Sequence, residues 1–303
     1  MSRFDVQHRD AFDSLAAARD AGGARLIVTS PPYPDARTPE QYGGASFDTT
    51  IAGYGRLGEA CFDALVPGGV VALNIDGPVR VWRDSWCQAQ SSARVSSSDG
   101  ARSERSLIAF KLAIDWAERI GFRYVERCAY VKRGISGAHG PRWSQGFELI
   151  HVLQRPGGKC VFNAANYKVP AAKPGRSWGG SRARWSGGWV STRGYTASED
   201  RCLTTAFSID VNKGNVDQEH PAPFARELAD AFVLCYSQPD DLVCDPFVGS
   251  GTVAFSCHRH GRRFVGGDLG HRETHHGKPC GRRWADIVND GLRQTTLFEA
   301  VAQ

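Results

Sequence analysis

The sequence predicts an α/β protein with a doubly wound, mostly parallel sheet, because apolar runs of strand length alternate with segments of helical period along its 303 residues. Two of these runs, Leu26–Val28 and Leu242–Cys244, stop abruptly in residues that suit loops. The first leads into Thr-Ser-Pro-Pro-Tyr at 29–33, and the second leads into Asp-Pro-Phe-Val-Gly-Ser-Gly-Thr at 245–252. Ligands of open α/β sheets lie beyond the carboxyl ends of strands, so we expect the two loops to face one cleft.

The first part of the chain is expected to alternate helices and strands. A helix over Ala11–Arg19 has Asp10 in position to cap its first turn. A second helix over Leu57–Leu65 is expected to stop at Pro67-Gly68-Gly69, before a strand over Val70–Leu73.

The middle of the chain predicts an excursion, a helix and two strands. Residues 84–105 are rich in Ser, Arg and Gln, which indicates a mobile excursion over the site. Apolar residues then recur at helical spacing, which predicts a core face made of Leu107, Phe110, Ile114, Ala117 and Ile120. The elements expected after it are strands over Phe122–Val131 and Phe147–Leu153, a helix opened by His220-Pro221-Ala222-Pro223, a helix from Thr252 to about His258, and a strand ending in Gly266-Gly267-Asp268.

The composition excludes several classes of protein. Hydrophobic residues make up 41% and charged residues 23% of the chain, as in ordinary globular proteins. The N-terminus lacks a signal-peptide core and no apolar stretch has membrane-spanning length, so we expect a cytoplasmic protein without a membrane partner. The nine cysteines form no Cys-x-x-Cys pair, and the His and Cys residues between 257 and 280 match no standard zinc spacing. We therefore expect reduced cysteines and no metal.

The positive charge is concentrated between residues 156 and 216. This segment has nine Lys and Arg against three acidic residues, a net charge of +6, whereas the rest of the chain is close to neutral at −1. Arginines and tryptophans alternate with glycines there, without helical or strand period. Such a pattern suits phosphate contacts, stacking and base-edge hydrogen bonds. The candidate DNA contacts are Arg176, Arg182, Arg184, Trp185 and Arg193. The alternative is a solvated glycine-rich loop with tryptophans packed against the core.

The glycine-rich loop indicates a small-molecule ligand. Gly249 and Gly251 let the backbone approach a ligand closely, and the helix that follows presents free N–H groups towards a carboxylate or phosphate. Asp268, at the end of the next strand, is placed to bond ribose hydroxyls, although it also suits a turn between Gly267 and Gly270. S-adenosylmethionine has both a carboxylate and an adenosine.

The diproline loop suits chemistry on an amino group. Two prolines fix the backbone, so Ser30 and the Pro31 carbonyl can be held as acceptors. The lone pair of a nucleobase amino group is delocalised into the ring. Accepting its two protons would favour a pyramidal nitrogen and stabilise the growing positive charge. Tyr33 can stack on a base flipped out of the duplex. In isolation the same residues could form a rigid turn with a core tyrosine.

Together the two loops resemble the amino-methylating DNA methyltransferases. The order of catalytic loop, basic insertion and cofactor loop resembles the permuted β class, which has a Rossmann-like domain. This resemblance implies a catalytic half at 1–155, a target-recognition insertion at 156–216 and a cofactor-binding half at 217–303. It implies the catalytic residues Ser30, Pro31, Pro32 and Tyr33. The implied cofactor-binding residues are Asp245, Pro246, Phe247, Gly249, Ser250, Gly251, Thr252, Asp268, His220 and Asp10.

The resemblance also orders the activities. Serine in the first catalytic position favours methylation of cytosine N4 in double-stranded DNA, with direct transfer from S-adenosylmethionine. Adenine N6 is the alternative, and methylation of RNA or of a protein amide ranks below it. A non-catalytic DNA-binding protein with this fold is a further alternative. The recognition sequence, a cognate restriction endonuclease and the oligomeric state are left open.

Overall fold

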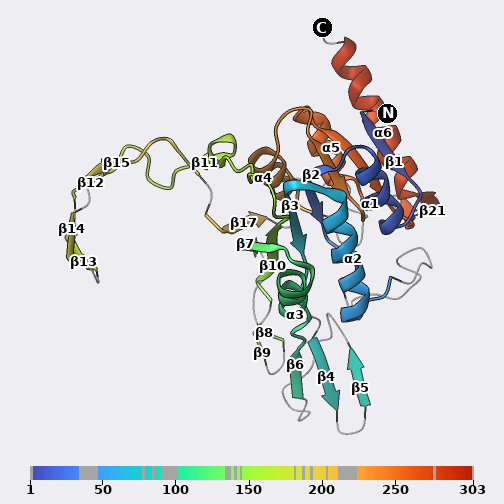
Figure 1. Cartoon of the computed structure of the whole chain (residues 1–303), viewed down its shortest axis with the longest axis horizontal. Helices are drawn as coiled ribbons and strands as arrows, with labels where there is room; N and C mark the ends of the chain where they lie inside the picture. The colour runs from blue at the N-terminus through green and yellow to red at the C-terminus, as the bar shows by residue number, and fades with distance from the viewer. Residues whose placement is uncertain are drawn as a thin grey trace.

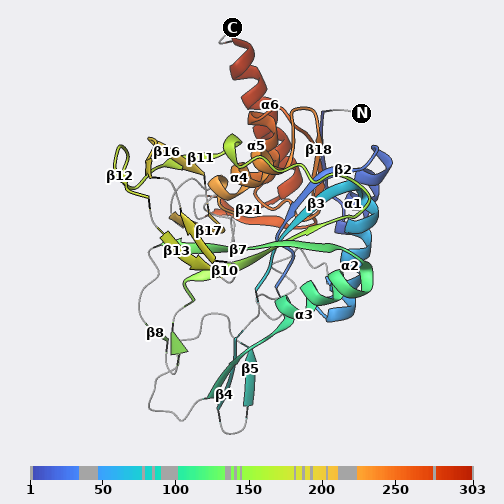
Figure 2. The ribbon, with the colours of Figure 1, turned by 60° about the vertical axis from the view of Figure 1, so that its left-hand side comes forward.

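The centre of the molecule is an eight-stranded sheet with helices on both faces (Figures 1 and 2). The computed structural model describes residues 3–33, 47–76, 79–83, 86–89, 102–133, 138–139, 142–143, 145–180, 182–185, 188–191, 194–202, 204–210, 224–275 and 278–301. The strands of the sheet are, in spatial order, β1 (Phe4–Gln7), β19 (Arg263–Gly267), β18 (Leu242–Asp245), β2 (Ala24–Thr29), β3 (Leu65–Asn74), β10 (Phe147–Gln154), β7 (Arg123–Arg133) and β17 (Ala206–Asp210).

Neighbouring strands run parallel except where β10 lies between β3 and β7. The predicted fold class, a doubly wound and mostly parallel sheet, is confirmed. The antiparallel β10 has a consequence for the site, because its N-terminal end lies at the same edge of the sheet as the carboxyl ends of β2, β3 and β7.

The two faces of the sheet bury separate cores. One core contains residues of α1 (Ala11–Asp20), α2 (Ile51–Ala64) and α3 (Ile108–Asp115), and the other contains residues of α4 (Arg226–Tyr236), α5 (Thr252–Arg259) and α6 (Trp284–Val301). Strand β2 shows how the sequence divides them. Leu26 and Val28 join the core of α4 to α6, whereas Ile27 between them joins the other core, because successive side chains of a strand point to opposite faces.

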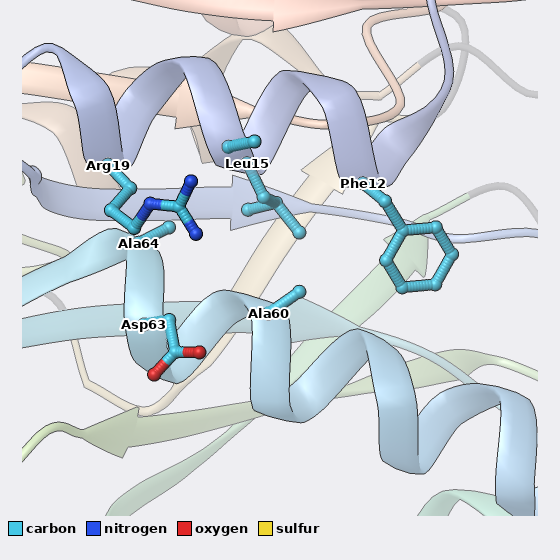
Figure 3. Close-up of a pocket in the computed structure, with 7 residues that line it drawn as sticks. Phe12, Leu15, Arg19, Ala60, Asp63 and Ala64 are labelled. Atoms are coloured by element: carbon cyan, nitrogen blue, oxygen red, sulfur yellow. The ribbon is translucent and has the colours of Figure 1, made fainter.

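Helix α1 begins as the sequence predicts. The Asp13 amide donates to the Asp10 carboxylate at 2.8 Å, which satisfies one of the free N–H groups of the first turn. Between α1 and α2 lies a shallow hollow of about 110 Å³ with a mostly apolar lining and the charged Arg19 and Asp63 at one end (Figure 3). The diproline and glycine-rich loops do not line it.

Helix α2 ends within one residue of the predicted position, but the break expected at Pro67-Gly68-Gly69 is wrong. Helix α2 ends at Ala64 and β3 begins at Leu65, so Pro67-Gly68-Gly69 lies inside the strand. Gly68 has φ +83 and its amide donates to the Arg155 carbonyl at 2.9 Å, while the Arg155 amide donates to the Gly69 carbonyl at 2.9 Å. These two hydrogen bonds continue the pairing of β3 beyond the end of β10, in an irregular stretch that the glycines allow. The glycines therefore belong to the sheet and do not end a helix.

The predicted core face of α3 is also largely wrong. Leu107, Phe110 and Ile114 are 59%, 44% and 54% exposed, and Ala117 and Ile120 are half-buried. The buried side consists of Ala109, Leu112, Ala113 and Trp116. The indole of Trp116 decides the orientation, because it is fully buried and donates to the Tyr54 carbonyl of α2 at 2.9 Å. The chain continues from α3 into a π-helical turn at Trp116–Ile120.

Residues between 168 and 202 form a β-arm. Its paired strands are β11 (Lys168–Pro170) with β16 (Asp200–Cys202), β12 (Ser177–Trp178) with β15 (Tyr195–Thr196), and β13 (Arg182–Trp185) with β14 (Gly188–Ser191). The pairings are nested and antiparallel, and Figure 1 shows the arm extending away from the sheet. The sequence does not predict these strands, because it has no strand period in this segment. Strand β17, which follows the arm, lies beside β7 in the central sheet.

The remaining elements are short. The segment expected as a mobile excursion holds strands of a three-stranded sheet formed by β4 (Val79–Arg83), β5 (Trp86–Ala89) and β6 (Arg102–Arg105). Two further hairpins pair β8 (Ala138–His139) with β9 (Arg142–Trp143) and β20 (His271–His275) with β21 (Lys278–Arg283), and a 3₁₀ turn covers Ala164–Asn166. Among the helices of the described residues, none is long and apolar enough to cross a lipid bilayer.

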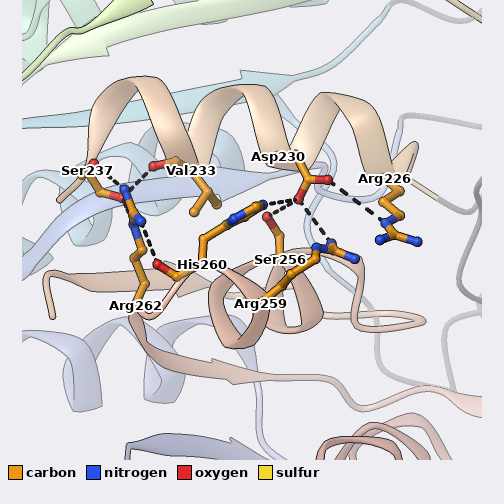
Figure 4. Close-up of polar contacts among 8 residues, drawn as sticks. All are labelled: Arg226, Asp230, Val233, Ser237, Ser256, Arg259, His260 and Arg262. Atoms are coloured by element: carbon orange, nitrogen blue, oxygen red, sulfur yellow. Dashed lines mark hydrogen bonds and ion pairs between the residues drawn. The ribbon is translucent and has the colours of Figure 1, made fainter. Parts of the chain in front are cut away.

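Helices α4 and α5 are joined by a polar cluster centred on Asp230 (Figure 4). One carboxylate oxygen accepts from Ser256 at 2.6 Å, Arg259 at 3.0 Å and His260 at 3.0 Å. These donors hold the pKa of Asp230 below its ordinary value, although burial acts in the opposite direction. The cluster fixes the helix that follows the glycine-rich loop against its neighbour.

Candidate active site

The diproline and glycine-rich loops follow neighbouring strands and are directly bonded. Strands β2 and β18 are parallel, with Leu26 beside Val243 and Ile27 beside Cys244. At the carboxyl ends of these strands the Thr29 hydroxyl donates to Asp245 Oδ1 at 3.0 Å, across 216 positions of sequence. This contact shows that the two loops lie next to each other, whereas the cleft that they are expected to face stays a prediction.

Asp245 is buried at the junction of the loops. Its Oδ1 also accepts from the Phe247 amide at 3.0 Å. Burial raises the pKa of Asp245 to about 7, against these two hydrogen bonds, which lower it, and the nearby Asp268 carboxylate adds to the rise. The carboxyl group can therefore be neutral near physiological pH. Its hydrogen bonds go to Thr29 and Phe247 of the two loops.

The glycine-rich loop is shaped by backbone conformations that glycine favours. Gly249 and Gly251 have φ of +51 and +84, and Gly251 is the N-cap of α5. A Cβ at Gly251 would lie 2.5 Å from a methyl of Val288 in α6. The sequence suggested that this glycine admits a ligand. The structure shows that the helix packing already requires it.

Asp268 braces the same loop from the end of β19. Its two carboxylate oxygens accept from the Gly249 amide at 2.8 Å and the Gly270 amide at 2.6 Å. The contact with Gly270 is the turn that the sequence offered as the alternative role. The ribose contact of Asp268 stays a prediction, and the side chain is held next to the loop that would bind the rest of the nucleoside.

The diproline loop is supported by two aromatic residues, Tyr54 and Phe47, that the sequence did not single out. Pro31 and Pro32 are buried, and the hydroxyl of Tyr54 donates to the Pro32 carbonyl at 2.5 Å. The ring of Phe47 lies 5.4 Å from that of Tyr54 and meets Phe247 edge-on at 5.3 Å. Phe47 thus connects the two loops through ring packing. No strand or helix signal surrounds it, so only the tertiary fold reveals this contact.

Tyr33 ends the loop and points its hydroxyl into a polar group. The phenol donates to Glu148 Oε2 at 3.3 Å, and the Asn74 amide donates to the same oxygen at 3.2 Å. Lys132 forms an ion pair with the other oxygen, Oε1. The pKa of Tyr33 lies well above its ordinary value, first because burial keeps water from its hydroxyl and then because of the Glu148 carboxylate, while a hydrogen bond with Ser30 lowers it. The phenol is therefore protonated and can donate.

The other predicted site residues lie in the glycine-rich loop, on other elements or outside the described residues. Asp10 caps α1, and Ser250 and Thr252 are buried at the start of α5 with their hydroxyls 3.4 Å apart. Arg176 is exposed at the start of the outer part of the arm. Arg182, Arg184 and Trp185 form β13, whereas His220 and Arg193 lie outside the described residues. The described residues contain no group of three metal-binding side chains.

Comparisons with known proteins give matches over most of the chain. The DNA methylase family model of N6 and N4 methyltransferases matches residues 24–277. The orphan methyltransferase M.BamHII of Bacillus amyloliquefaciens is 24% identical over 286 residues, which is 90% of each chain. The PvuII cytosine-N4-specific DNA methyltransferase superposes with a TM-score of 0.58 and 16% identity, covering 97% of this chain and 94% of that chain. The M1.HpyAVI–SAM complex gives a TM-score of 0.56 and 16% identity over 95% and 98% of the two chains.

Proposed function

Since the chain belongs to the N6/N4 DNA methylase family, the β-class amino methyltransferases that use S-adenosylmethionine, we propose that it methylates N4 of a flipped-out cytosine at a specific DNA site. The hydrogen bond between Thr29 and Asp245 carries the proposal, because it holds the catalytic loop against the cofactor loop. Serine at position 30 supports the choice of cytosine over adenine.

The residues of the glycine-rich loop fit the cofactor. Gly249 has no side chain to obstruct an approaching ligand, the missing Cβ of Gly251 leaves room for Val288 of α6, and α5 begins there with free amides. We assign the cofactor to this loop, with Asp268 at its edge and Phe247 beside it. When bound, S-adenosylmethionine supplies the methyl group as an electrophile.

The diproline loop supplies the acceptors for the target amino group. In the proposed reaction Ser30 Oγ and the Pro31 carbonyl accept the two N4 protons, and Tyr33 stacks on the extracted base. With the donor bound, the new C–N bond would replace its C–S bond, and the nitrogen would then lose one proton to solvent. The fixed dipoles of the loop stabilise the positive charge that grows on the nitrogen.

The test is analysis of DNA nucleosides by mass spectrometry after incubation with the enzyme and S-adenosylmethionine. We expect N4-methylcytosine. N6-methyladenine as the sole product would refute the base assignment, and a chain that binds the cofactor but methylates no DNA would be a binding protein. Ser30→Ala is the matched variant, which should retain cofactor binding in a calorimetric titration and lose most of its turnover.

We also propose that the β-arm contacts the DNA target. A two-stranded ribbon fits the major groove, and the segment from 156 to 216 carries the positive charge of the chain. Arg182→Ala and Arg184→Ala should each weaken DNA binding and reduce the slope of log affinity against log salt by about 1 if the residue contacts one phosphate. The control is Arg19→Ala on the exposed side of α1. Unchanged DNA affinity at low salt would remove that arginine from the DNA surface.

A further inference from the structure

Three strands bring a polar group to the hydroxyl of Tyr33. Asn74 is the last residue of β3, Lys132 lies near the end of β7, and Glu148 is the second residue of β10. Because β10 runs antiparallel to its two neighbours, its beginning lies beside their ends. All three side chains therefore reach the edge of the sheet at which the diproline loop leaves β2.

The group consists of three donors around one carboxylate. Glu148 Oε2 accepts from Tyr33 and Asn74, and Oε1 accepts from Lys132. The side chains of Glu148 and Lys132 are only 16% and 24% exposed, so the ion pair is partly shielded from water. A carboxylate has acceptors alone, which matches three donors, whereas a glutamine amide would turn N–H groups towards one of them.

The phenol of Tyr33 lies between this group and the catalytic loop. The Tyr33 hydroxyl is hydrogen-bonded to Glu148 at 3.3 Å, and Ser30 forms a hydrogen bond with the Tyr33 side chain. A tyrosine ring turns about two side-chain torsions. The hydroxyl oxygen lies on the axis of the second torsion, so a contact there restricts the first directly, and it restricts the second because a phenolic O–H prefers to lie in the plane of the ring. The ring plane of Tyr33 therefore depends on where Glu148 is held.

We propose that Glu148 is a positioning residue for methyl transfer: it fixes the ring of Tyr33 in the orientation that stacks on the target base, and Lys132 and Asn74 hold Glu148 in place. This inference rests on the proposed function, in which Tyr33 is the stacking residue. Glu148 touches neither base nor cofactor in this role and acts only through the phenol.

Kinetics test the proposal through a double-mutant cycle. Glu148→Gln and Lys132→Met should each lower kcat by about 10- to 100-fold, the range for a displaced reacting group, with less than about a twofold change in cofactor affinity by calorimetry. In a Tyr33→Phe background, which retains the ring but lacks the hydroxyl, the same substitutions should have little further effect. Equal losses in both backgrounds, or no loss in the Tyr33 background, would overturn the proposal. The matched control is Glu126→Gln, at the exposed far end of β7.

A second measurement needs neither DNA nor turnover. With 3-fluorotyrosine at position 33, the fluorine NMR resonance should shift in Glu148→Gln and Lys132→Met but not in Glu126→Gln. An unshifted resonance overturns the proposal even where the wild type methylates DNA. If the resonance shifts in these variants but the wild type methylates no DNA, the proposed function is refuted, and with it the stacking role, while the contact between Tyr33 and Glu148 is retained. If Glu148→Gln does not fold, Lys132→Met tests the same coupling.

Discussion

Replacing Gly251 by alanine separates a requirement of the fold from a requirement of the ligand. The residue has φ +84, where an alanine costs about 1–2 kcal/mol relative to glycine. Its Cβ would lie 2.5 Å and 2.8 Å from the two methyls of the fully buried Val288. Such overpacking costs about 1–3 kcal/mol. We therefore expect Gly251→Ala to lower the free energy of unfolding of the cofactor-free protein by about 2–5 kcal/mol, measured by urea unfolding.

Val288→Ala provides the matched variant. Alone it removes two buried methyl groups and should cost about 1–3 kcal/mol. In the double variant the shortened side chain makes room for the new Cβ. The loss of stability in the double variant should therefore be smaller than the sum of the two single losses by about 1–3 kcal/mol, while the backbone cost at Gly251 remains. Additive losses would refute the proposed contact with Val288. A Gly251→Ala protein of unchanged stability that has lost only its cofactor affinity would instead show that the ligand requires the glycine.

Three further predictions concern buried charge. The pKa of Asp245 in the folded state, about 7, lies above the ordinary 3.8, so the wild type loses stability as the pH rises through the folded-state pKa. Asp245→Asn removes this titration and should gain about 3 kcal/mol relative to the wild type between about pH 5 and pH 8, measured by urea unfolding. His151 is buried and its pKa falls to about 4 from 6.5, mainly through burial and then through Arg127, so the wild type should lose about 3 kcal/mol as the pH falls across that interval, and His151→Leu should flatten this loss. A parallel pH profile in either variant would contradict the corresponding assignment. Asp230→Ala should cost about 2–3 kcal/mol, since it leaves three donors without their acceptor, and Asp230→Asn should cost less because one oxygen is retained. Equal melting temperatures of these two variants would show that the cluster does not stabilise the contact of α4 with α5.

The sequence predicts the elements of the site better than their surroundings. Strand-to-loop transitions at 29–33 and 245–252 are local signals, because a proline pair or a glycine pair after an apolar run has few structural interpretations. Their juxtaposition follows from the rule that ligand loops lie beyond the carboxyl ends of strands. The cap at Asp10 is local in the same way and is confirmed.

The wrong predictions concern features that tertiary contacts decide. Around α3 the sequence offers two apolar stripes, one through Phe110 and Ile114 and one through Leu112 and Trp116. Both have helical period, and the buried bond from Trp116 to Tyr54 selects the second. The arm was missed because its strands have no core to face, so the alternation that marks a buried strand is absent.

Glu148, Lys132 and Asn74 could not have been assigned from the sequence. Asn74 and Glu148 lie at the ends of mainly apolar strands, and Lys132 lies in a strand with several other charged residues. A polar residue in such a place has no defined role until its neighbours are known. Their meeting depends on the strand order β3-β10-β7 and on the reversed direction of β10. Strand order is a non-local property that no spacing in this chain records.

The same non-local property explains why the diproline loop can precede the glycine-rich loop by more than two hundred residues. The site is assembled across adjacent strands, and the contacts that join its halves, from Thr29 to Asp245 and from Phe47 to Phe247, run between β2 and β18 or their loops. Chain order affects neither contact, provided that the two strands stay neighbours. The long segment between them can therefore carry an arm on one side of the sheet while the paired strands keep the loops in register.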